Sequence, residues 1–208
     1  MLFNPVNKDV YPKLTSALQV LQNMLGYLAE AHTSNIEDRE RLIKVIETHD
    51  NVLSESLNEI ILITSKKLIL PIDREDIHAI TSAIIYIKDY TINCANKMTV
   101  YYLDAYSEAQ IALINSIASV SKRVKKAVLE TENISKNSTS IIENCLKIKT
   151  ITASCRADID DITIQLFSSN QNTLEIIKQL ELLKVYSSLI KQFELLRRQI
   201  LNTVIKFS

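Results

Sequence analysis

The sequence predicts an all-α protein, and three observations support that prediction. The chain has 208 residues, with one glycine, Gly26, and three prolines, the last of them Pro71. No residue from Ile72 to Ser208 is glycine or proline, whereas tight turns between paired strands depend on glycine. Apolar residues also recur at alternating spacings of three and four, which is typical of a helix packed along its length.

Three apolar seams with this spacing follow one another, and each predicts a helix. The first consists of Ile43, Ile46, Asp50, Leu53, Leu57, Ile60 and Thr64. The second consists of Ile77, Ile80, Ile84, Ile87, Thr91, Cys94, Met98 and Tyr101. The third consists of Ile141, Cys145, Ile148, Thr152, Cys155, Ile159, Ile162 and Leu166. Strands alternate every second residue and do not keep this spacing, so even the Ile-rich segments are predicted to be helical.

Polar clusters set the predicted boundaries, because glycine marks none of them. They lie at 32–35, at Pro71, near Asp104, at 132–140 and in SSNQN at 168–172. The predicted helices are residues 8–31, 36–67, 73–101, 104–133, 138–167 and 173–206, six in all. The second and third join at Pro71 and the fifth and sixth at SSNQN, so each pair forms an antiparallel hairpin preceded by one further helix. We expect a single domain, residues 1–208, with three-helix pseudo-repeats at about 1–103 and 104–208.

The composition excludes several functional classes. The 24 Lys and Arg residues balance the 24 Asp and Glu residues, whereas proteins that bind nucleic acid or anionic membranes usually carry a basic surplus. Glycine-rich phosphate loops and Rossmann motifs need glycines that the chain lacks. No apolar run approaches the roughly 18 residues of a membrane span, and the N-terminus does not resemble a secretory signal. We expect a cytoplasmic protein that binds no nucleic acid and is peripheral to a membrane at most.

The cysteines and the densest acidic cluster do not indicate a catalytic site. Cys94, Cys145 and Cys155 form no Cys-x-x-Cys pair and occupy seam positions, which predicts free, buried, structural thiols rather than nucleophiles. Asp73, Glu75 and Asp76 follow Pro71 closely, where a helix start favours a capping residue and acids in its first turn. We therefore expect no catalytic residue.

Glu75 and His78 form a Glu-x-x-His, the half-motif of ferritin-like di-iron bundles. Such a site needs a second copy in mid-helix, and neither of the other two histidines follows a Glu at that spacing. Glu75 also lies in a predicted first turn. The sequence therefore excludes a di-iron oxidase.

Asp50 is the residue that the seams single out, because it stands where an apolar residue is expected. A buried charge there costs several kcal/mol unless it is paired or bound to a cation. The hairpin at Pro71 brings Asp89 to a similar height. Two facing carboxylates can hold a hard cation, but a Lys or Arg partner would serve equally well. We favour the basic partner and keep a metal ion as the alternative.

The string PIDREDIHAI at 71–80 resembles the hinge of the PhoU-related family of phosphate-transport regulators. Members of that family carry a Pro-Phe-Asp-Arg-Glu-Asp-Ile-like string there, and this chain has Ile72 in place of the aromatic residue. LF at 166–167 and EIIK at 175–178 resemble the family's second half. The family is a six-helix duplication of a three-helix unit, so the resemblance covers the whole chain.

The resemblance also implies where metal ions would bind, because family members carry Glu-x-x-x-Asp pairs associated with one metal cluster per half. In the register of Pro71, the first-half positions are Asp50, Ser54, Ile85 and Asp89, so each pair keeps one acid. The second-half positions are Thr152, Arg156, Ser187 and Lys191, so all four acids are lost and two cations would repel a metal. We expect no cofactor, with a weak divalent or iron site at Asp50 and Asp89 as the alternative.

The resemblance implies a non-enzymatic regulator of inorganic phosphate uptake that acts through protein–protein contacts. Its expected partner is a phosphate transporter or an associated signalling protein. Formation of a homo-oligomer is a further alternative. The alternative function is a metal-free helical-bundle scaffold whose protein contacts are unrelated to phosphate. A metal-dependent enzyme ranks last.

Overall fold

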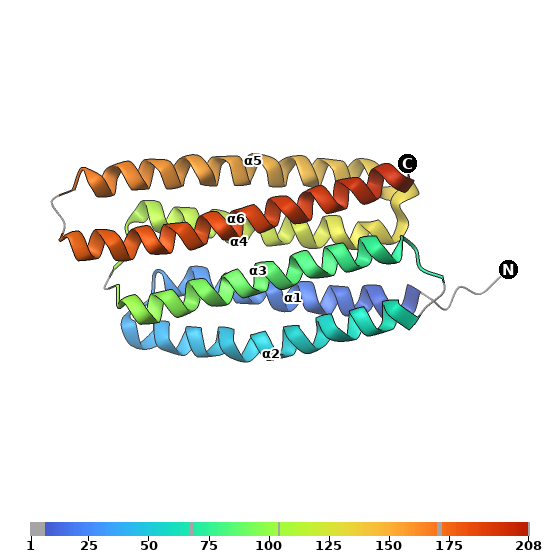
Figure 1. The fold of residues 1–208 in the computed structure, drawn as a ribbon, viewed down its shortest axis with the longest axis horizontal. Coiled ribbons are helices and arrows are strands. Elements are labelled where there is room, and N and C mark those ends of the chain that lie inside the picture. The colour runs from blue at the N-terminus through green and yellow to red at the C-terminus, as the bar shows by residue number, and fades with distance from the viewer. Residues whose placement is uncertain (1–6, 67–68, 104, 170–171, 208) are drawn as a thin grey trace.

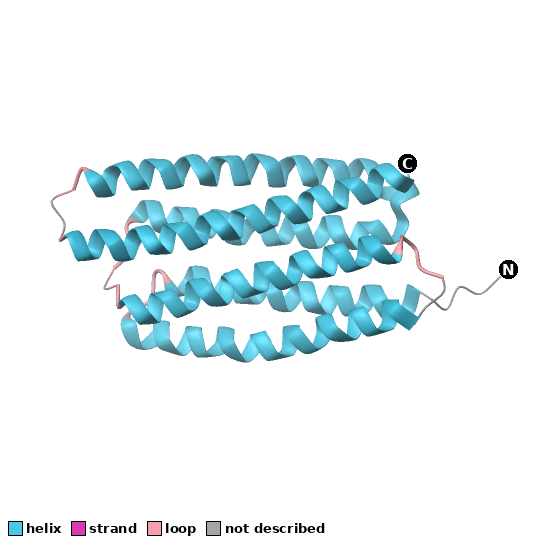
Figure 2. Cartoon of the chain, viewed as in Figure 1, coloured by secondary structure: helices cyan, strands magenta, loops and turns pink. Residues whose placement is uncertain are grey.

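The computed structural model describes residues 7–66, 69–103, 105–169 and 172–207, with side chains from Val10 onward. These residues form α1 (Asn7–Ala31), α2 (Ile36–Lys66), α3 (Arg74–Tyr101), α4 (Glu108–Glu130), a 3₁₀ turn η1 (Thr131–Asn133), α5 (Ile134–Phe167) and α6 (Thr173–Phe207). No strand occurs in these ranges (Figure 2). The all-α prediction is confirmed.

The helices run side by side along the long axis of the molecule (Figure 1). In that view α5 and α2 lie at opposite edges, and the other helices lie between them. α1 packs against α2 and α4, while α6 packs against α3 and α5. Helices from the first and second halves of the chain therefore share one hydrophobic core.

The three predicted seams face that core. Leu53, Ile84 and Ile148, one from the middle of each seam, have exposed fractions of 0%. Asp50, Tyr101 and Ile159 are the seam members that are partly buried rather than buried. The helical periodicity therefore predicted which faces of α2, α3 and α5 are buried, because side chains three and four positions apart share one face of a helix.

The helix ends show how a chain with one glycine makes its turns. Tyr102 ends α3 in the left-handed conformation with φ 46°, a conformation that glycine usually supplies. α4 begins at Glu108 and not at the predicted residue 104. The reason is a capping box: the Ser107 side chain accepts from the Gln110 backbone N–H, and the Gln110 side chain accepts from the Ser107 backbone N–H.

The predicted polar break at 132–140 is wrong, since most of it is helical. α4 ends at Glu130, and α5 begins at Ile134 rather than at residue 138. Ile134 is buried, which holds this turn of α5 against the core. Asn137 Nδ2 donates to the Glu130 carbonyl at 3.2 Å, and Ser140 Oγ donates to the Glu130 carboxylate at 2.8 Å. The polar residues of this segment therefore satisfy the end of α4 instead of forming a loop.

Asp73 occupies the N-cap position of α3 as predicted, but its side chain makes no capping hydrogen bond. It faces the last turn of α6, where Lys206 Nζ lies 3.8 Å from Asp73 and 2.8 Å from the buried Asp76. The hydrogen bond with Asp76 raises the pKa of Lys206. The acidic cluster therefore ties the start of α3 to the end of α6.

Some predicted boundaries cannot be placed. The helix end at Lys67, the weak break at Asp104, and Asn170 and Gln171 of SSNQN lie outside the described residues. Among the described helices, none combines the length and the apolar character that crossing a membrane requires.

Candidate functional site

The structure places Lys88 of α3 between the two predicted site residues. Lys88 Nζ lies 2.5 Å from Asp50 Oδ1 on α2 and 3.0 Å from Asp89 Oδ1 on α3. The Lys88 side chain is 10% exposed, that of Asp50 32% and that of Asp89 53%. Lys88 thus supplies the basic partner that the sequence favoured for Asp50.

Burial lowers the pKa of Lys88, but its hydrogen bonds to Asp50 and Asp89 outweigh burial, so the pKa is raised overall. The remaining first-half positions are not acids: Ser54 Oγ donates to Asp50 at 3.4 Å, and Ile85 packs against the core. A metal ion would have to displace the Lys88 ammonium group to reach both carboxylates. We therefore expect a structural ion triad here.

The second-half positions do not come together as a site. Thr152 is buried and its hydroxyl donates to the Ile148 carbonyl at 2.9 Å. Ser187 and Lys191 are exposed on α6. Arg156 on α5 instead pairs with Glu194 on α6, at 2.5 Å.

In the Arg156–Glu194 pair, the acid and the base have exchanged helices relative to the pair in the first half. The acid lies on α2 and the base on α3 in the Asp50–Lys88 pair, whereas the base lies on α5 and the acid on α6 in the Arg156–Glu194 pair. Among the described residues, no three His, Cys, Asp or Glu side chains gather closely enough to hold a metal ion.

Asp50→Asn is expected to lower the free energy of unfolding by about 1 to 3 kcal/mol, because it leaves the buried Lys88 ammonium short of a charged partner. Thermal melts with and without a chelator measure this, and we expect the same loss in both. Asp89→Asn is the matched control: its carboxylate is more exposed, so the loss should stay below about 1 kcal/mol. Chelator sensitivity of the wild type alone would instead establish a metal at Asp50 and Asp89.

A buried polar cluster that the sequence did not predict lies where α1, α2 and α6 meet the connection between α3 and α4. It consists of His32, Arg39, Tyr106 and Tyr186, all buried. The rings of His32 and Tyr106 are 4.4 Å apart between centroids, and the Arg39 guanidinium lies 5.0 Å from the Tyr106 ring centre. Arg39 continues the first seam, at spacings of three and four before Leu42 and Ile43, which is the signal that could have revealed it.

His32 links α1 to α6. Its Nδ1 lies 2.6 Å from the Leu28 carbonyl, which can only accept, so Nδ1 carries the proton. Nε2 then accepts from the Tyr186 hydroxyl. Burial lowers the pKa of His32 to about 4, with a further contribution from the charge of Arg39. His32 is therefore neutral in the folded protein at pH 7.

Arg39 joins the α1–α2 turn to the segment that follows α3. Its guanidinium donates to the carbonyls of Ala31, at 3.2 Å, Ser34, at 3.3 Å, and Leu103. The Tyr106 hydroxyl beside it is buried with no hydrogen-bond partner among the described residues. Burial raises the pKa of Tyr106 to about 12. These groups bind backbone and one another, so the cluster is structural in character.

The cysteines behave as structural thiols. Cys94, Cys145 and Cys155 are free and buried, as predicted. Burial raises the pKa of Cys145 and of Cys155 to about 11, and raises that of Cys94 further. A thiol must ionise to act as a nucleophile, so the three cysteines are poorly suited to catalysis.

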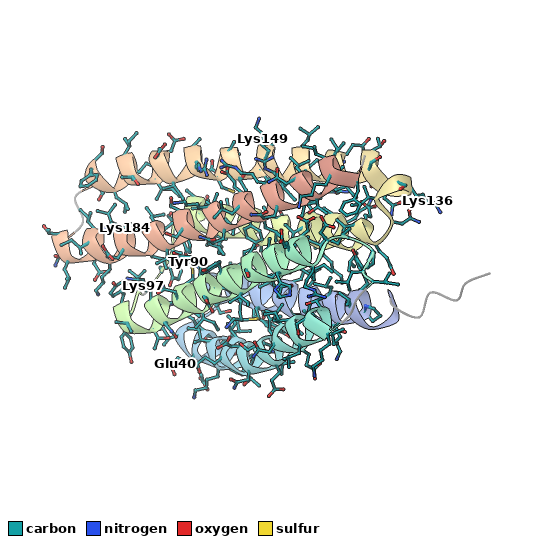
Figure 3. The ribbon with its side chains drawn as sticks, turned by 45° about the vertical axis from the view of Figure 1, so that its right-hand side comes forward. Glu40, Tyr90, Lys97, Lys136, Lys149 and Lys184 are labelled. Carbon is teal, nitrogen blue, oxygen red and sulfur yellow. The ribbon has the colours of Figure 1, made fainter. Side chains whose placement is uncertain are left out.

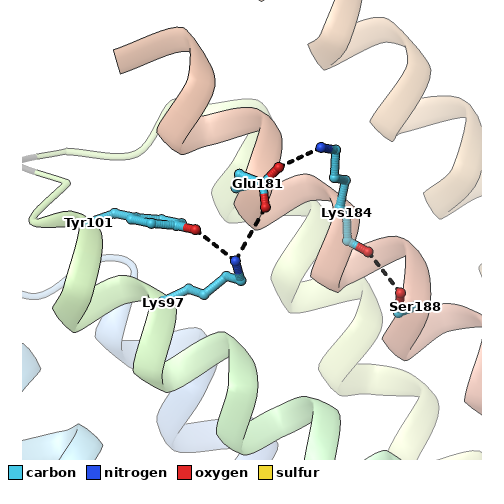
Figure 4. A network of polar contacts seen from close by, with 5 residues as sticks. All are labelled: Lys97, Tyr101, Glu181, Lys184 and Ser188. Carbon is cyan, nitrogen blue, oxygen red and sulfur yellow. Dashed lines mark hydrogen bonds and ion pairs between the residues drawn. The ribbon is translucent and has the colours of Figure 1, made fainter. Parts of the chain in front are cut away.

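A surface network also connects α3 to α6 (Figure 4). Lys97 Nζ donates to the Tyr101 hydroxyl at 2.7 Å and lies 3.4 Å from Glu181, which Lys184 also contacts. Ser188 Oγ donates to the Lys184 carbonyl at 3.0 Å. Ion pairs at the surface usually contribute less than about 1 kcal/mol to stability, so we expect this partly exposed network to contribute little.

An open groove with a volume of about 620 Å³ lies between α1 and α4. Its lining includes Gly26, where an added Cβ would meet nothing within 4 Å, and the amide side chains of Gln22, Asn23 and Asn115. Lys122 and Glu30, of opposite charge, complete its polar rim. The groove gathers no set of groups suited to a particular reaction.

No protein-family model matches the chain, and no curated protein matches it either. Solved structures do. A PhoU-like protein from Shewanella oneidensis MR-1 matches with a TM-score of 0.84 and 12% identity, over 94% of this chain and 99% of that one. A PhoU-like phosphate regulatory protein from the same strain matches with a TM-score of 0.82 and 13% identity, over the same shares. The chain has the fold of PhoU-like proteins, as the resemblance implied.

Proposed function

We propose that this protein is a non-enzymatic regulator of inorganic phosphate uptake. It acts in the cytoplasm through protein–protein contacts with a phosphate transporter or an associated signalling protein. The observation that supports this proposal is the match in fold, over nearly the full length of both chains, to a PhoU-like phosphate regulatory protein. The structural character of the buried polar groups described above is consistent with a non-catalytic role.

We further propose that the chain is a single domain made of two three-helix units, 1–103 and 104–208. Within the first unit α2 contacts α1 and α3, and within the second α5 contacts α4 and α6. The pairs Asp50–Lys88 and Arg156–Glu194 occupy comparable places, since each joins the two helices of a hairpin across a sequence separation of 38. These correspondences support a duplication.

One observation favours a second function, that of a metal-free scaffold unrelated to phosphate. Where the resemblance implies acids for two metal clusters, this chain has a triad centred on Lys88 and the pair of Arg156 with Glu194. A protein that has replaced those acids by ion pairs could retain the bundle for protein contacts alone.

Deleting the gene in its host distinguishes the two functions. We expect that the rate of phosphate uptake in the deletion strain no longer differs between cells grown with ample and with scarce phosphate. Uptake of labelled phosphate measures this, sulfate uptake serves as the control, and the wild-type gene should restore the difference. A deletion strain whose phosphate uptake still responds fully to phosphate would support the scaffold.

A further inference from the structure

An apolar groove lies on the outer surface between α4 and α5. It has a volume of about 370 Å³ and is lined by Arg123, Glu143, Leu146, Lys147, Thr150 and Ile151. Leu146 is 57% exposed and Ile142, one turn before it on α5, is 41% exposed. Exposed apolar side chains that adjoin a groove, rather than lying singly on the surface, are typical of a binding site.

Two basic side chains line this groove and a third lies close to it in sequence. Arg123 on α4 and Lys147 on α5 line it and are exposed. Lys149 is also exposed and points outward from α5 (Figure 3). None of these three cations forms an ion pair within the described part of the chain. Their charges are therefore available to a partner, and the aliphatic stems of Arg and Lys extend the apolar floor.

The charges of this net-neutral chain are unevenly distributed along the sequence. Residues 122–149 contain seven Lys or Arg and three Asp or Glu, whereas α2 contains seven Asp or Glu and four Lys or Arg. Residues 122–149 run from the second half of α4 to the first half of α5, the part of the two helices that lines the groove. The stretch of chain that lines the groove therefore carries a basic surplus, which attracts an anionic partner.

We propose that the groove between α4 and α5 docks an acidic amphipathic helix of a partner protein. An amphipathic helix inserts apolar residues spaced by three and four into such a groove, and Ile142, Leu146 and Thr150, spaced by four along α5, provide the matching row. Acidic residues beside its apolar stripe then meet Arg123 and Lys147. The inference rests on the proposed action through protein contacts, but it does not depend on phosphate.

Glu143 allows the proposal to be tested by a gain in affinity for the acidic helix as well as by a loss. It is the acidic residue in the lining of the groove and it is exposed. It therefore repels an acidic helix while its neighbours attract one. Glu143→Lys removes the repulsion without touching the core, so its effect cannot be attributed to unfolding.

The test uses a labelled 18-residue helical peptide with leucines at spacings of three and four and glutamates at the flanking positions, followed by fluorescence anisotropy. We expect the purified protein to bind it, and to bind less tightly as salt increases. Leu146→Asp and the pair Arg123→Glu with Lys147→Glu should each weaken binding by about tenfold or more, and Glu143→Lys should tighten it. Ile164→Asp, at an exposed position on α5 outside the groove lining, should leave binding unchanged.

Other occupants of the groove give different results. The proposal is overturned if a lysine-flanked peptide binds equally well, or if Leu146→Asp binds the acidic peptide as tightly as wild type does. It is also overturned if Leu146 is needed instead for self-association in sedimentation, or for binding vesicles of phosphatidylglycerol, while the acidic peptide does not bind. Because the assay contains no phosphate, its outcome is scored separately from the uptake experiment.

Discussion

Replacing Arg39 with methionine is expected to lower the free energy of unfolding by about 3 to 5 kcal/mol, because three backbone carbonyls lose a charged hydrogen-bond donor. The guanidinium donates to the carbonyls of Ala31, Ser34 and Leu103. Methionine fills similar volume but leaves those carbonyls without their donor. For a chain of 208 residues, each kcal/mol corresponds to roughly 2 to 4 °C in melting temperature.

Arg41→Met is the matched control, because Arg41 lies on the same helix, is 75% exposed and pairs with Asp38 at the surface. Its expected cost is below about 1 kcal/mol. Urea unfolding of both variants measures the difference. Arg39→Lys should fall between wild type and Arg39→Met, since an ammonium group cannot reach all three carbonyls. Equal stability of Arg39→Met and Arg41→Met would show that the network does not hold the helix ends together.

Lowering the pH from about 6.5 to about 4 is expected to destabilise the protein by up to about 3 kcal/mol through His32 alone. Burial lowers the pKa of His32 from 6.5 to about 4 in the folded state. Between these values the unfolded chain binds more protons than the folded one, so stability rises with pH. The stabilisation is complete above pH 6.5 and is lost as the pH falls toward 4.

Urea unfolding at pH 7 and at pH 4.5 measures this effect. His32→Gln has no titrating ring, so its loss of stability between the two pH values should be smaller than that of wild type, even though it is less stable at pH 7. His49→Gln retains His32 and should keep the wild-type dependence. If His32→Gln and wild type lose the same stability on acidification, other groups control the acid sensitivity.

The candidate site was only partly predictable from the sequence. The seam singled out Asp50, since one charged residue among apolar ones at helical spacing is visible in the sequence. Lys88 was not identified, although it lies four residues after Ile84 and three before Thr91 and so also fits the second seam. Whether Asp50 met a metal or an ammonium group depended on the rotation of α3 against α2, which spacing within one helix does not determine.

The helix boundaries were also only partly predictable from the sequence. The polar run at 132–140 predicted a loop, but Ile134 packs into the core and its burial stabilises the segment as the first turn of α5. By contrast, the true start of α4 was present locally as a Ser-x-x-Gln capping box at Ser107 and Gln110, and could have been read from the sequence. Tertiary burial overrode local polarity in the first case, whereas a local hydrogen-bonding motif decided the second.

The fold class and the buried faces of the helices could be inferred from the amino-acid sequence, because a scarcity of glycine and a spacing of three and four are local properties that leave few alternatives. Which polar residues meet inside the bundle depends on the packing of the helices and could not be inferred in this way. His32 contacts Tyr186, which lies 154 residues away in the sequence, and Arg156 pairs with Glu194, a residue that the sequence did not single out. Such pairings depend on how helices are rotated and staggered against one another, and the free energy that selects one arrangement is spread over the whole core.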